Sequence, residues 1–321
     1  MSDAGERAEQ ELSPLLSPVQ AQALSPAQAL LLGLAHGPGE LLPISSSAHT
    51  TLVPWLLGWR YAELEPRLRK SFEVALHLGT AIALVSRPPW HSDGALRRGS
   101  SSSEESGAWP RPIVLAGALA PPALVGFALG ERIERQLGTP GTIAAGLVAG
   151  TVAMALPELC SSGRRAACGR QDARGPGKVG RGRRAEQAEA RDGLALGTAQ
   201  ALALVPGLSR SGLAGAAARS RGFGRLQADR LGWQVGLPVI GGAALLQSAR
   251  LLRRGVRREE RAALAVGAIG ALLSTRACVR LLDARTRTRL LPATIVYRAA
   301  LAALVIRRMR DNTEGSIQTT A

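Results

Sequence analysis

The sequence predicts an all-α, polytopic integral membrane protein, an inverted-topology repeat with two re-entrant helix pairs and about six to eight spans. Three observations predict this fold class. Long runs of Ala, Leu, Gly and Val alternate with short charged stretches. The net charge of +16 comes almost entirely from arginines that lie between these apolar runs, as in loops that orient membrane proteins. Two similar motifs, each with a proline turn and several serines, lie in the two halves of the chain.

The apolar windows determine which segments are expected to cross the membrane. They fall near residues 27–36, 41–58, 72–86, 112–130, 141–159, 193–207, 232–248, 262–274 and 289–306. A span needs ~20 apolar residues. The windows long enough for a full span are 41–58, 112–130, 141–159, 232–248 and 289–306. Windows 27–36 and 193–207 are short and end in Gly/Pro-rich polar motifs, which favours re-entrant helices.

Polar segments divide the chain around these windows. Residues 1–25 are predicted to be a polar tail, because Glu6, Glu9 and Glu11 do not fit the positive start of a secretory signal. Residues 26–308 form one membrane domain with halves 26–159 and 193–308, and 309–321 form a second polar tail. The arginine-rich loop 160–192 links the halves and is expected to be cytoplasmic, as is 249–261.

Composition argues against two other classes of protein. Aromatic residues make up only 3% of the 321 residues, too few for a surface that stacks nucleic-acid bases. A basic nucleic-acid-binding protein is therefore the most distant alternative, and no nucleic-acid partner is expected. Cys160 and Cys168 have no further Cys or His nearby to complete a zinc site, and three cysteines cannot make a disulfide framework.

The first motif runs from Gly33 to His49 and places an acid, three hydroxyls and a histidine inside apolar sequence. Such groups are costly in hydrocarbon unless they face a wet cavity or a partner, so Glu40 is a functional candidate by position. Pro43 and the serines that follow it predict a helix beginning near residues 45–47. Its free backbone N–H groups would form an anion site inside the membrane.

The second motif runs from Gly197 to Gly212 and has the same layout of short helix, proline turn, hydroxyl cluster and helix. Pro206 is predicted to correspond to Pro43, and the second pair of serines to the first. The second motif adds Arg210, whose planar guanidinium suits bidentate phosphate binding. Two related motifs in two halves are the trace that an inverted repeat leaves in sequence.

Together the motifs predict a site for a buried phosphate ester or anhydride. Glu40 could hold a divalent metal or act as a base, while a serine could attack phosphorus with His49 activating it or protonating the leaving group. The predicted catalytic residues are Glu40, Ser46, His49 and Arg210. The predicted phosphate-binding residues are Ser45, Ser47, Ser209, Arg210, Ser211 and Gly212. The predicted metal ligands are Glu40 and His36.

At these residues the chain resembles a known family. The segments 40–49 and 206–212 resemble the two signature motifs of the undecaprenyl-diphosphatase family, the bacitracin-resistance type of membrane phosphatase. The segment 72–79 is similar to the one that follows the first motif, and Tyr297-Arg298 resembles the family's closing Tyr-Arg pair. By motif position, Ser46 matches the family's nucleophile, His49 its essential histidine and Arg210 its phosphate-binding arginine.

The resemblance implies the function and its setting. Family members hydrolyse undecaprenyl diphosphate to undecaprenyl phosphate and phosphate, which recycles the lipid carrier of peptidoglycan synthesis and confers bacitracin resistance. The resemblance also implies the bacterial plasma membrane, a site facing its outer side, a prenyl diphosphate lipid as partner, and dependence on Mg²⁺ or Ca²⁺. Gly146 and Gly150 form a small-xxx-small pair that permits close helix packing and a homodimer.

Three departures from the family pattern keep alternatives open. His36 stands where the family has Glu or Gln, Ala48 where it has Gly, and Ala214 where it commonly has Thr. Glu73 could replace the missing acid.

A transporter or flippase for a prenyl phosphate or small anion suits an inverted repeat equally well, and a catalytically inactive scaffold is a third hypothesis.

Overall fold

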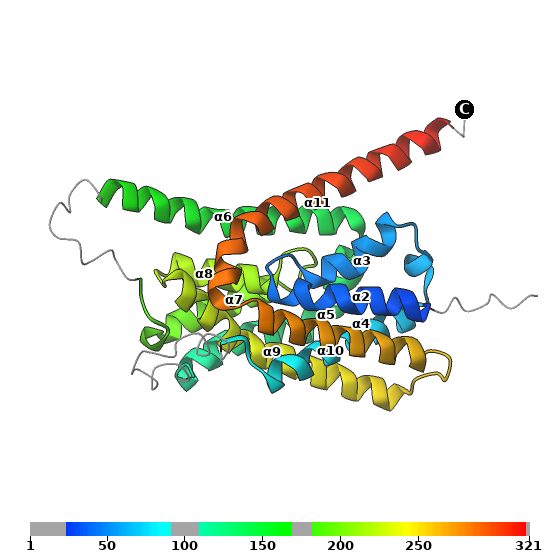
Figure 1. The fold of residues 1–321 in the computed structure, drawn as a ribbon, viewed down its shortest axis with the longest axis horizontal. Coiled ribbons are helices and arrows are strands. Elements are labelled where there is room, and N and C mark those ends of the chain that lie inside the picture. The colour runs from blue at the N-terminus through cyan, green and yellow to red at the C-terminus, as the bar shows by residue number, and fades with distance from the viewer. Residues whose placement is uncertain (1–23, 91–108, 169–181, 319–321) are drawn as a thin grey trace, which may run out of the picture.

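The computed structural model describes residues 24–90, 109–168 and 182–318, and their regular structure is helical apart from one bridge pair, Arg183–Phe223 (Figure 1). Residues 1–23 of the predicted tail and parts of the predicted loops therefore lie outside the described residues, while Leu24 and Ser25 lie directly before the first described helix. The α-helices are α2 (Pro26–Leu41), α3 (Ser46–Leu56), α4 (Pro66–Ser86), α5 (Pro112–Leu137), α6 (Pro140–Cys168), α7 (Ala190–Leu202), α8 (Arg210–Ser220), α9 (Arg225–Arg254), α10 (Arg261–Leu281) and α11 (Ala284–Gln318). Two 3₁₀ turns, η1 (Arg60–Glu63) and η3 (Ala185–Gln187), connect them.

Local sequence explains where several helices begin. Proline occupies the first turn of α2, α4 and α5, where its missing N–H costs nothing and its fixed φ is already helical. Ser25 caps α2, and its side chain and that of Gln28 bond each other's backbone N–H in a capping box. The all-α prediction is thus confirmed for the described residues.

Five of the described helices are long and apolar enough to cross a membrane: α5, α6 up to Cys160, α9, α10 and α11 up to Thr313. The multi-pass prediction is therefore confirmed. On α5, Leu124 and Phe127 are 70% and 84% exposed, as expected of a face in contact with lipid. The window 41–58 was wrongly expected to span, because the chain leaves helical geometry between Leu41 and Ser46. Instead α10 is long and apolar enough to span, although its window, 262–274, was not among those predicted to be of sufficient length.

Two pairs of short helices carry the motifs. Helices α2 and α3 have 16 and 11 residues, and α7 and α8 have 13 and 11. At ~1.5 Å per residue none reaches across a ~30 Å hydrocarbon core. These lengths are those that re-entrant pairs require, while the direction of each pair and the number of spans remain predictions.

Glycines bring the short helices close to long ones. Helix α10 packs against α2, where a Cβ on Gly33 would lie 2.5 Å from the Gly267 carbonyl oxygen. Helix α5 packs against α7, where a Cβ on Gly193 would lie 2.3 Å from the Val114 carbonyl oxygen. The first short helix of each pair, α2 or α7, is therefore held against a long helix at backbone contact distance, which fixes the position of each motif.

Helices α6 and α11 form a separate layer, in which they lie side by side along one edge of the molecule (Figure 1). A core cluster joins α3, α6 and α11 through Ala48, Leu52, Ile143, Leu147, Leu301 and Val305. The end of α11 projects beyond the body, so residues 309–318, predicted as polar tail, continue this helix (Figure 1). Helix α6 likewise continues past residue 160, where the linker loop was predicted to begin, and exposes the free thiol of Cys160.

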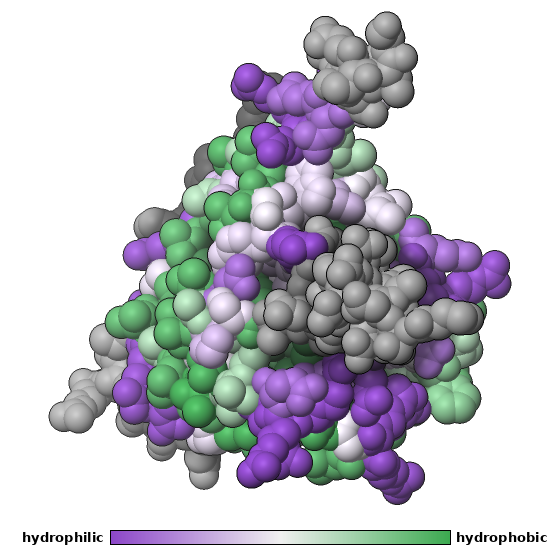
Figure 2. All heavy atoms as spheres, turned by 90° about the vertical axis from the view of Figure 1, so that its right-hand side faces the viewer, coloured by the Kyte–Doolittle hydropathy of each residue, from purple (hydrophilic) through white to green (hydrophobic). Residues whose placement is uncertain are grey.

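Hydrophilic and hydrophobic side chains are segregated at one end of the molecule (Figure 2). Hydrophilic residues gather over its lower part, on the side where Figure 1 places the turn between α9 and α10. This turn follows Arg253 and Arg254 and contains Arg257. An arginine-rich turn beside apolar helices is typical of a loop at the membrane surface.

Candidate active site

Two turns of the same geometry build the site. Ser45 caps α3 and Ser209 caps α8, and their φ values of 73° and 57° are the only positive values among the described residues other than glycine. Each side chain accepts a 3.4 Å hydrogen bond from a backbone N–H three residues later, at Ala48 and at Gly212. Both helices therefore begin where the motifs predicted.

Aligning the two caps corrects one detail of the predicted repeat. With Ser45 placed on Ser209, Pro43 corresponds to Gly207 and not to Pro206. The left-handed backbone explains the difference, because each half turns at the cap serine itself. Gly207, with φ of 96°, allows the second turn to bend without a proline at that position.

Glu40 joins the two motifs. Its Oε1 accepts a 2.5 Å hydrogen bond from the Ser46 hydroxyl, and its Oε2 accepts a 2.7 Å charged bond from Arg210. The Glu40 side chain is only 8% exposed, and the Arg210 side chain is 19% exposed. A carboxylate and a hydroxyl of the first motif and a guanidinium of the second thus lie within direct hydrogen-bonding distance, as the predicted site requires.

Arg210 is oriented by its surroundings. Its Nη1 donates to the Gly236 carbonyl at 3.3 Å, and its guanidinium lies 5.9 Å from the centre of the Trp233 ring. A pocket beside it is lined by Arg210 and Ser211 and by a mixture of charged and apolar side chains. The charged ones are Glu158, Arg219, Arg225, Asp229 and Arg287, and the apolar ones include Leu41, Pro43, Met154, Trp233 and Leu291. A pocket lined by both kinds of side chain suits an amphipathic ligand.

His49 has partners for both ring nitrogens. Its Nδ1 lies 2.7 Å from the Ser45 carbonyl oxygen, which can only accept, so Nδ1 carries a proton. Its Nε2 lies 2.6 Å from the Tyr297 hydroxyl, which then donates to it. The Ser46 hydroxyl donates to Glu40, so His49 is not the observed acceptor for that proton.

The remaining serines line the helix starts. The hydroxyls of Ser45 and Ser47 lie 3.2 Å apart, and those of Ser209 and Ser211 lie 3.5 Å apart. Gly212 lies so close to Met154 that an added Cβ would come within 2.4 Å of its sulfur. All six predicted phosphate-binding residues therefore belong to two matching helix N-termini.

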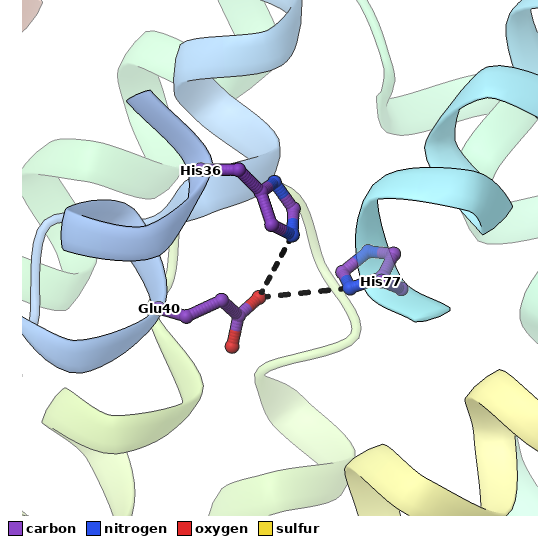
Figure 3. A group of neighbouring side chains, drawn as sticks. All are labelled: His36, Glu40 and His77. Atoms are coloured by element: carbon purple, nitrogen blue, oxygen red, sulfur yellow. Dashed lines mark ion pairs between the residues drawn. The ribbon is translucent and has the colours of Figure 1, made fainter. Parts of the chain in front are cut away.

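His36 lies beside Glu40, and a second histidine that the sequence did not single out joins it. His36 Nε2 and His77 Nδ1 lie 3.8 and 3.7 Å from Glu40 Oε1 (Figure 3). Glu73, expected to replace the missing acid, instead lies 3.8 Å from Lys70. His77 follows Glu73 by one helical turn on α4, so the spacing of that segment was the signal that could have found it.

Arg298 is the largest fully buried side chain among the described residues and was not assigned a role from sequence. Its guanidinium donates to the Pro43 carbonyl at 3.2 Å and to the Gly207 carbonyl at 2.8 Å. It also donates to the Leu147 carbonyl and to the Thr151 hydroxyl on α6. The arginine therefore joins both turns to the α6–α11 layer.

Two departures from the family pattern lie in packed cores. Ala48 is fully buried in the α3–α6–α11 cluster, and Ala214 is 1% exposed in a cluster with Ala218 and Leu231. Neither methyl group takes part in the polar contacts around Glu40. His36 is thus the departure that changes the chemistry of the site.

Comparisons with known proteins identify the family. The model of a family described as "Bacitracin resistance protein BacA" matches residues 29–304. The chain belongs to this family. Undecaprenyl-diphosphatase from Geobacter metallireducens is 35% identical over 252 residues, which cover 76% of this chain and 83% of the relative. Proteins of the same name from Pelobacter propionicus and Thermomicrobium roseum are each 32% identical, covering 87% of this chain and 95% and 96% of their own lengths.

Membership of the BacA family confirms the resemblance found in the motifs. The family match includes both turns, the histidine pair and the Tyr297-Arg298 segment. Together with the five apolar helices, it assigns the protein to the multi-pass proteins of the bacterial inner membrane.

Proposed function

We propose that this protein hydrolyses undecaprenyl diphosphate to undecaprenyl phosphate and inorganic phosphate. The relatives named undecaprenyl-diphosphatase support the substrate. The observation that carries the proposal is the contact of Glu40 with both Ser46 and Arg210, which brings a base, a nucleophile and an anion-binding group together. The reaction would return the lipid carrier to peptidoglycan synthesis and underlie bacitracin resistance.

The diphosphate would bind between the two turns. A diphosphate carries about −2 to −3 charge at neutral pH, and burying it without compensation is prohibitive. Arg210 has further N–H donors beyond those used by Glu40 and Gly236, and the N-termini of α3 and α8 add backbone donors. The prenyl chain would leave along the apolar pocket walls toward lipid.

Ser46 is positioned to attack the terminal phosphorus. Its Oγ would form the new P–O bond while its proton passes to Glu40 Oε1, which already accepts its hydrogen bond. The anhydride P–O bond to the lipid phosphate would break, and Arg210 would bind the charge on the transferred group. Water would then release phosphate from the phosphoserine and regenerate the serine.

His49 and Tyr297 are assigned to the leaving group. Ser46 has Glu40 as its proton acceptor, so the pair of imidazole and phenol is left for the leaving group. The Tyr297 hydroxyl proton, donated to His49 Nε2 before the reaction, would pass to the departing lipid phosphate and be restored from solvent when phosphate is released. The Ser45 carbonyl holds the imidazole in one orientation. A water molecule as direct nucleophile is the alternative that the tests below separate from attack by Ser46.

The setting of the site completes the proposal. The site is expected to open toward the outer side of the plasma membrane, where lipid diphosphate is released during wall synthesis. Phosphate release by intact spheroplasts, compared with inverted vesicles, measures this orientation. Cross-linking in native membranes measures whether the predicted homodimer forms.

The decisive experiment is phosphate release from undecaprenyl diphosphate and from a short prenyl diphosphate by the detergent-purified protein. Replacing Glu40 with Gln, Ser46 with Ala or Arg210 with Gln should each lower kcat/KM by roughly 10²–10³, as removal of a transition-state partner does. Arg210→Lys should recover only part of the activity, because an ammonium cannot form the bidentate contact. Glu134→Gln, which removes an exposed pair with Lys70, is the control and should behave as wild type.

Three outcomes would contradict the proposal. Full activity in both Glu40→Gln and Arg210→Gln would exclude this site as the catalytic centre. Translocation of a prenyl phosphate across liposomes without hydrolysis would favour transport instead, and neither activity would favour a scaffold. Trapping of ³²P on Ser46 in a quenched reaction would distinguish a phosphoserine from direct attack by water.

A further inference from the structure

Three side chains beside the proposed nucleophile point toward one another. His36 and Glu40 lie one turn apart on α2, and His77 reaches the same place from α4 (Figure 3). The same carboxylate oxygen, Glu40 Oε1, lies 3.8 Å from His36 Nε2 and 3.7 Å from His77 Nδ1. These three possible ligand atoms all lie within 4.8 Å of one another. The rings meet edge to face with centroids 4.8 Å apart.

His36 is a buried polar group without a hydrogen-bond partner in the described part of the chain. The residue is 1% exposed, and neither of its ring nitrogens has a hydrogen-bond partner among the described residues. Leaving such a group unsatisfied is costly, by about 1–3 kcal/mol for a typical buried donor or acceptor. An ion bound to Nε2 would remove part of that cost, so the unpaired imidazole itself points to a ligand.

We propose that His36, Glu40 and His77 bind a divalent transition-metal ion, with Zn²⁺ as the main candidate. This inference rests on the proposed function and concerns the same site. Mg²⁺ and Ca²⁺ prefer oxygen ligands, whereas imidazole nitrogen suits Zn²⁺ and its transition-metal neighbours. Two nitrogens and one carboxylate oxygen therefore do not fit the Mg²⁺ or Ca²⁺ that the family resemblance implied.

The distances fit an ion of this class. Zinc–nitrogen and zinc–oxygen bonds of ~2.0–2.2 Å place neighbouring ligand atoms about 3.4 Å apart in a tetrahedral site. The two imidazole–carboxylate distances need to shorten by only a few tenths of an ångström. The two imidazole nitrogens, within 4.8 Å of each other, would have to approach by up to ~1.4 Å, which a turn of the exposed His77 side chain can provide. Three protein ligands with an open fourth position are the arrangement of catalytic rather than structural zinc sites.

The carboxylate of Glu40 can still bind an ion through one of its oxygens. Arg210 binds the other carboxylate oxygen, Oε2, so Oε1 keeps a lone pair beyond the one that accepts from Ser46. The side chain of His77 is 40% exposed, which gives an ion a route to the group. A bound cation would supply further positive charge for a diphosphate.

Metal content measured without substrate tests the proposal. The protein, carrying an affinity tag without histidines, is stripped with chelator and equilibrated with equal concentrations of Zn²⁺, Mn²⁺, Mg²⁺ and Ca²⁺. Mass spectrometry should find one transition-metal ion per chain and little Mg²⁺ or Ca²⁺. His36→Gln and His77→Gln should each weaken binding by about 100-fold or more, since even outer-shell changes cost 10–100-fold.

Two further variants make the test specific. His36→Glu should move selectivity toward Mg²⁺ and Ca²⁺, because it replaces a nitrogen ligand with oxygen. His49→Gln should bind metal as wild type does while losing hydrolysis, since His49 is held by Ser45 and Tyr297. Size-exclusion profiles establish that each variant is folded, and the visible spectrum of the Co²⁺-loaded protein should change in His77→Gln but not in His49→Gln.

Unchanged metal binding in His77→Gln, or preference for Mg²⁺ or Ca²⁺ in the wild type, would overturn the metal proposal. An enzyme that hydrolyses the lipid but binds no transition metal would overturn it while leaving the proposed function intact. A protein that binds Zn²⁺ through these ligands but hydrolyses nothing would support the metal site and contradict the function.

Discussion

The carbonyl oxygens of Pro43 and Gly207 bind the same guanidinium, that of Arg298, at 3.2 and 2.8 Å. These two residues occupy equivalent positions in the two turns when the caps Ser45 and Ser209 are aligned. One side chain from α11 therefore fixes the distance between two turns that are far apart in the chain. Because Glu40 and Arg210 flank these turns, the same guanidinium positions both charged groups of the site.

Replacing Arg298 should affect stability and activity together. Arg298→Leu would leave several buried carbonyls without a donor, at about 1–3 kcal/mol each, so we expect the free energy of unfolding to fall by at least ~3 kcal/mol. Arg298→Lys should be intermediate, because an ammonium cannot reach both turns in the same planar geometry. Thermal unfolding in detergent and phosphate release measure the two effects.

Arg310→Leu, an exposed arginine on the same helix, is the matched control and should change neither quantity. Wild-type activity in Arg298→Leu would show that the two turns hold their spacing without this guanidinium.

Two substitutions of the cap serine Ser209 distinguish the effect of its positive φ from the effect of its hydroxyl. Ser209→Gly removes the hydroxyl but suits φ of 57°, whereas Ser209→Ala removes it and keeps the strained backbone. We expect the glycine variant to be more stable than the alanine variant by about 1 kcal/mol, since left-handed geometry costs a residue with a Cβ roughly that much. If the hydroxyl binds phosphate, both variants should show a similar rise in KM for the diphosphate.

Steady-state kinetics with thermal unfolding of both Ser209 variants give the comparison, and Ser45→Gly repeats it in the first turn. A KM that falls back to the wild-type value in Ser209→Gly would assign the serine a purely conformational role.

Gly146 on α6 supports the second turn. A Cβ at this position would lie 2.3 Å from the Pro206 carbonyl oxygen, so Gly146→Ala must push the turn away. We expect a loss of about 1–3 kcal/mol in stability and a lower kcat, because Arg210 would move from Glu40. Thermal unfolding and phosphate release provide the two measurements.

Gly130→Ala is its control, since a Cβ there has no neighbour within 4 Å. The control should raise stability by roughly 0.5–1 kcal/mol, as alanine does in a helix interior. Equal behaviour of the two variants would mean that the turn adapts to the added methyl group.

Tyr297 contributes one hydroxyl to His49. Tyr297→Phe removes the 2.6 Å hydrogen bond but keeps the ring, which is stacked on the imidazole at 5.6 Å between centroids. We expect kcat to fall by roughly 2–10-fold, the equivalent of one hydrogen bond of ~0.5–1.5 kcal/mol. His49→Gln should cost more, and the double variant should be no worse than His49→Gln alone if the two residues act as one unit.

Additive losses in this double-mutant cycle would contradict the assignment of the pair to one proton transfer. Rates with a prenyl diphosphate at several pH values measure each variant.

Sequence patterning by itself determined the fold class and the residues around Glu40. A long apolar segment is stable in lipid because of the hydrophobic effect, so the apolar windows predict the helices directly. Polar residues inside such windows are rare and therefore indicate a site. Local turn chemistry, carried by Pro43 and the serines, likewise predicted where α3 and α8 begin. These features depend on neighbours along the chain.

Tertiary structure decided which distant groups meet. The contact of Glu40 with Arg210, the approach of His77 to His36, and the clamp formed by Arg298 depend on close packing of α2, α4, α8 and α11. Periodicity places a residue on a helix face but does not say which other helix that face will touch. The chemistry of the site was therefore visible in the sequence, whereas the pairing of its groups, including the contact of the two histidines, arose only when glycines let the helices approach to backbone contact.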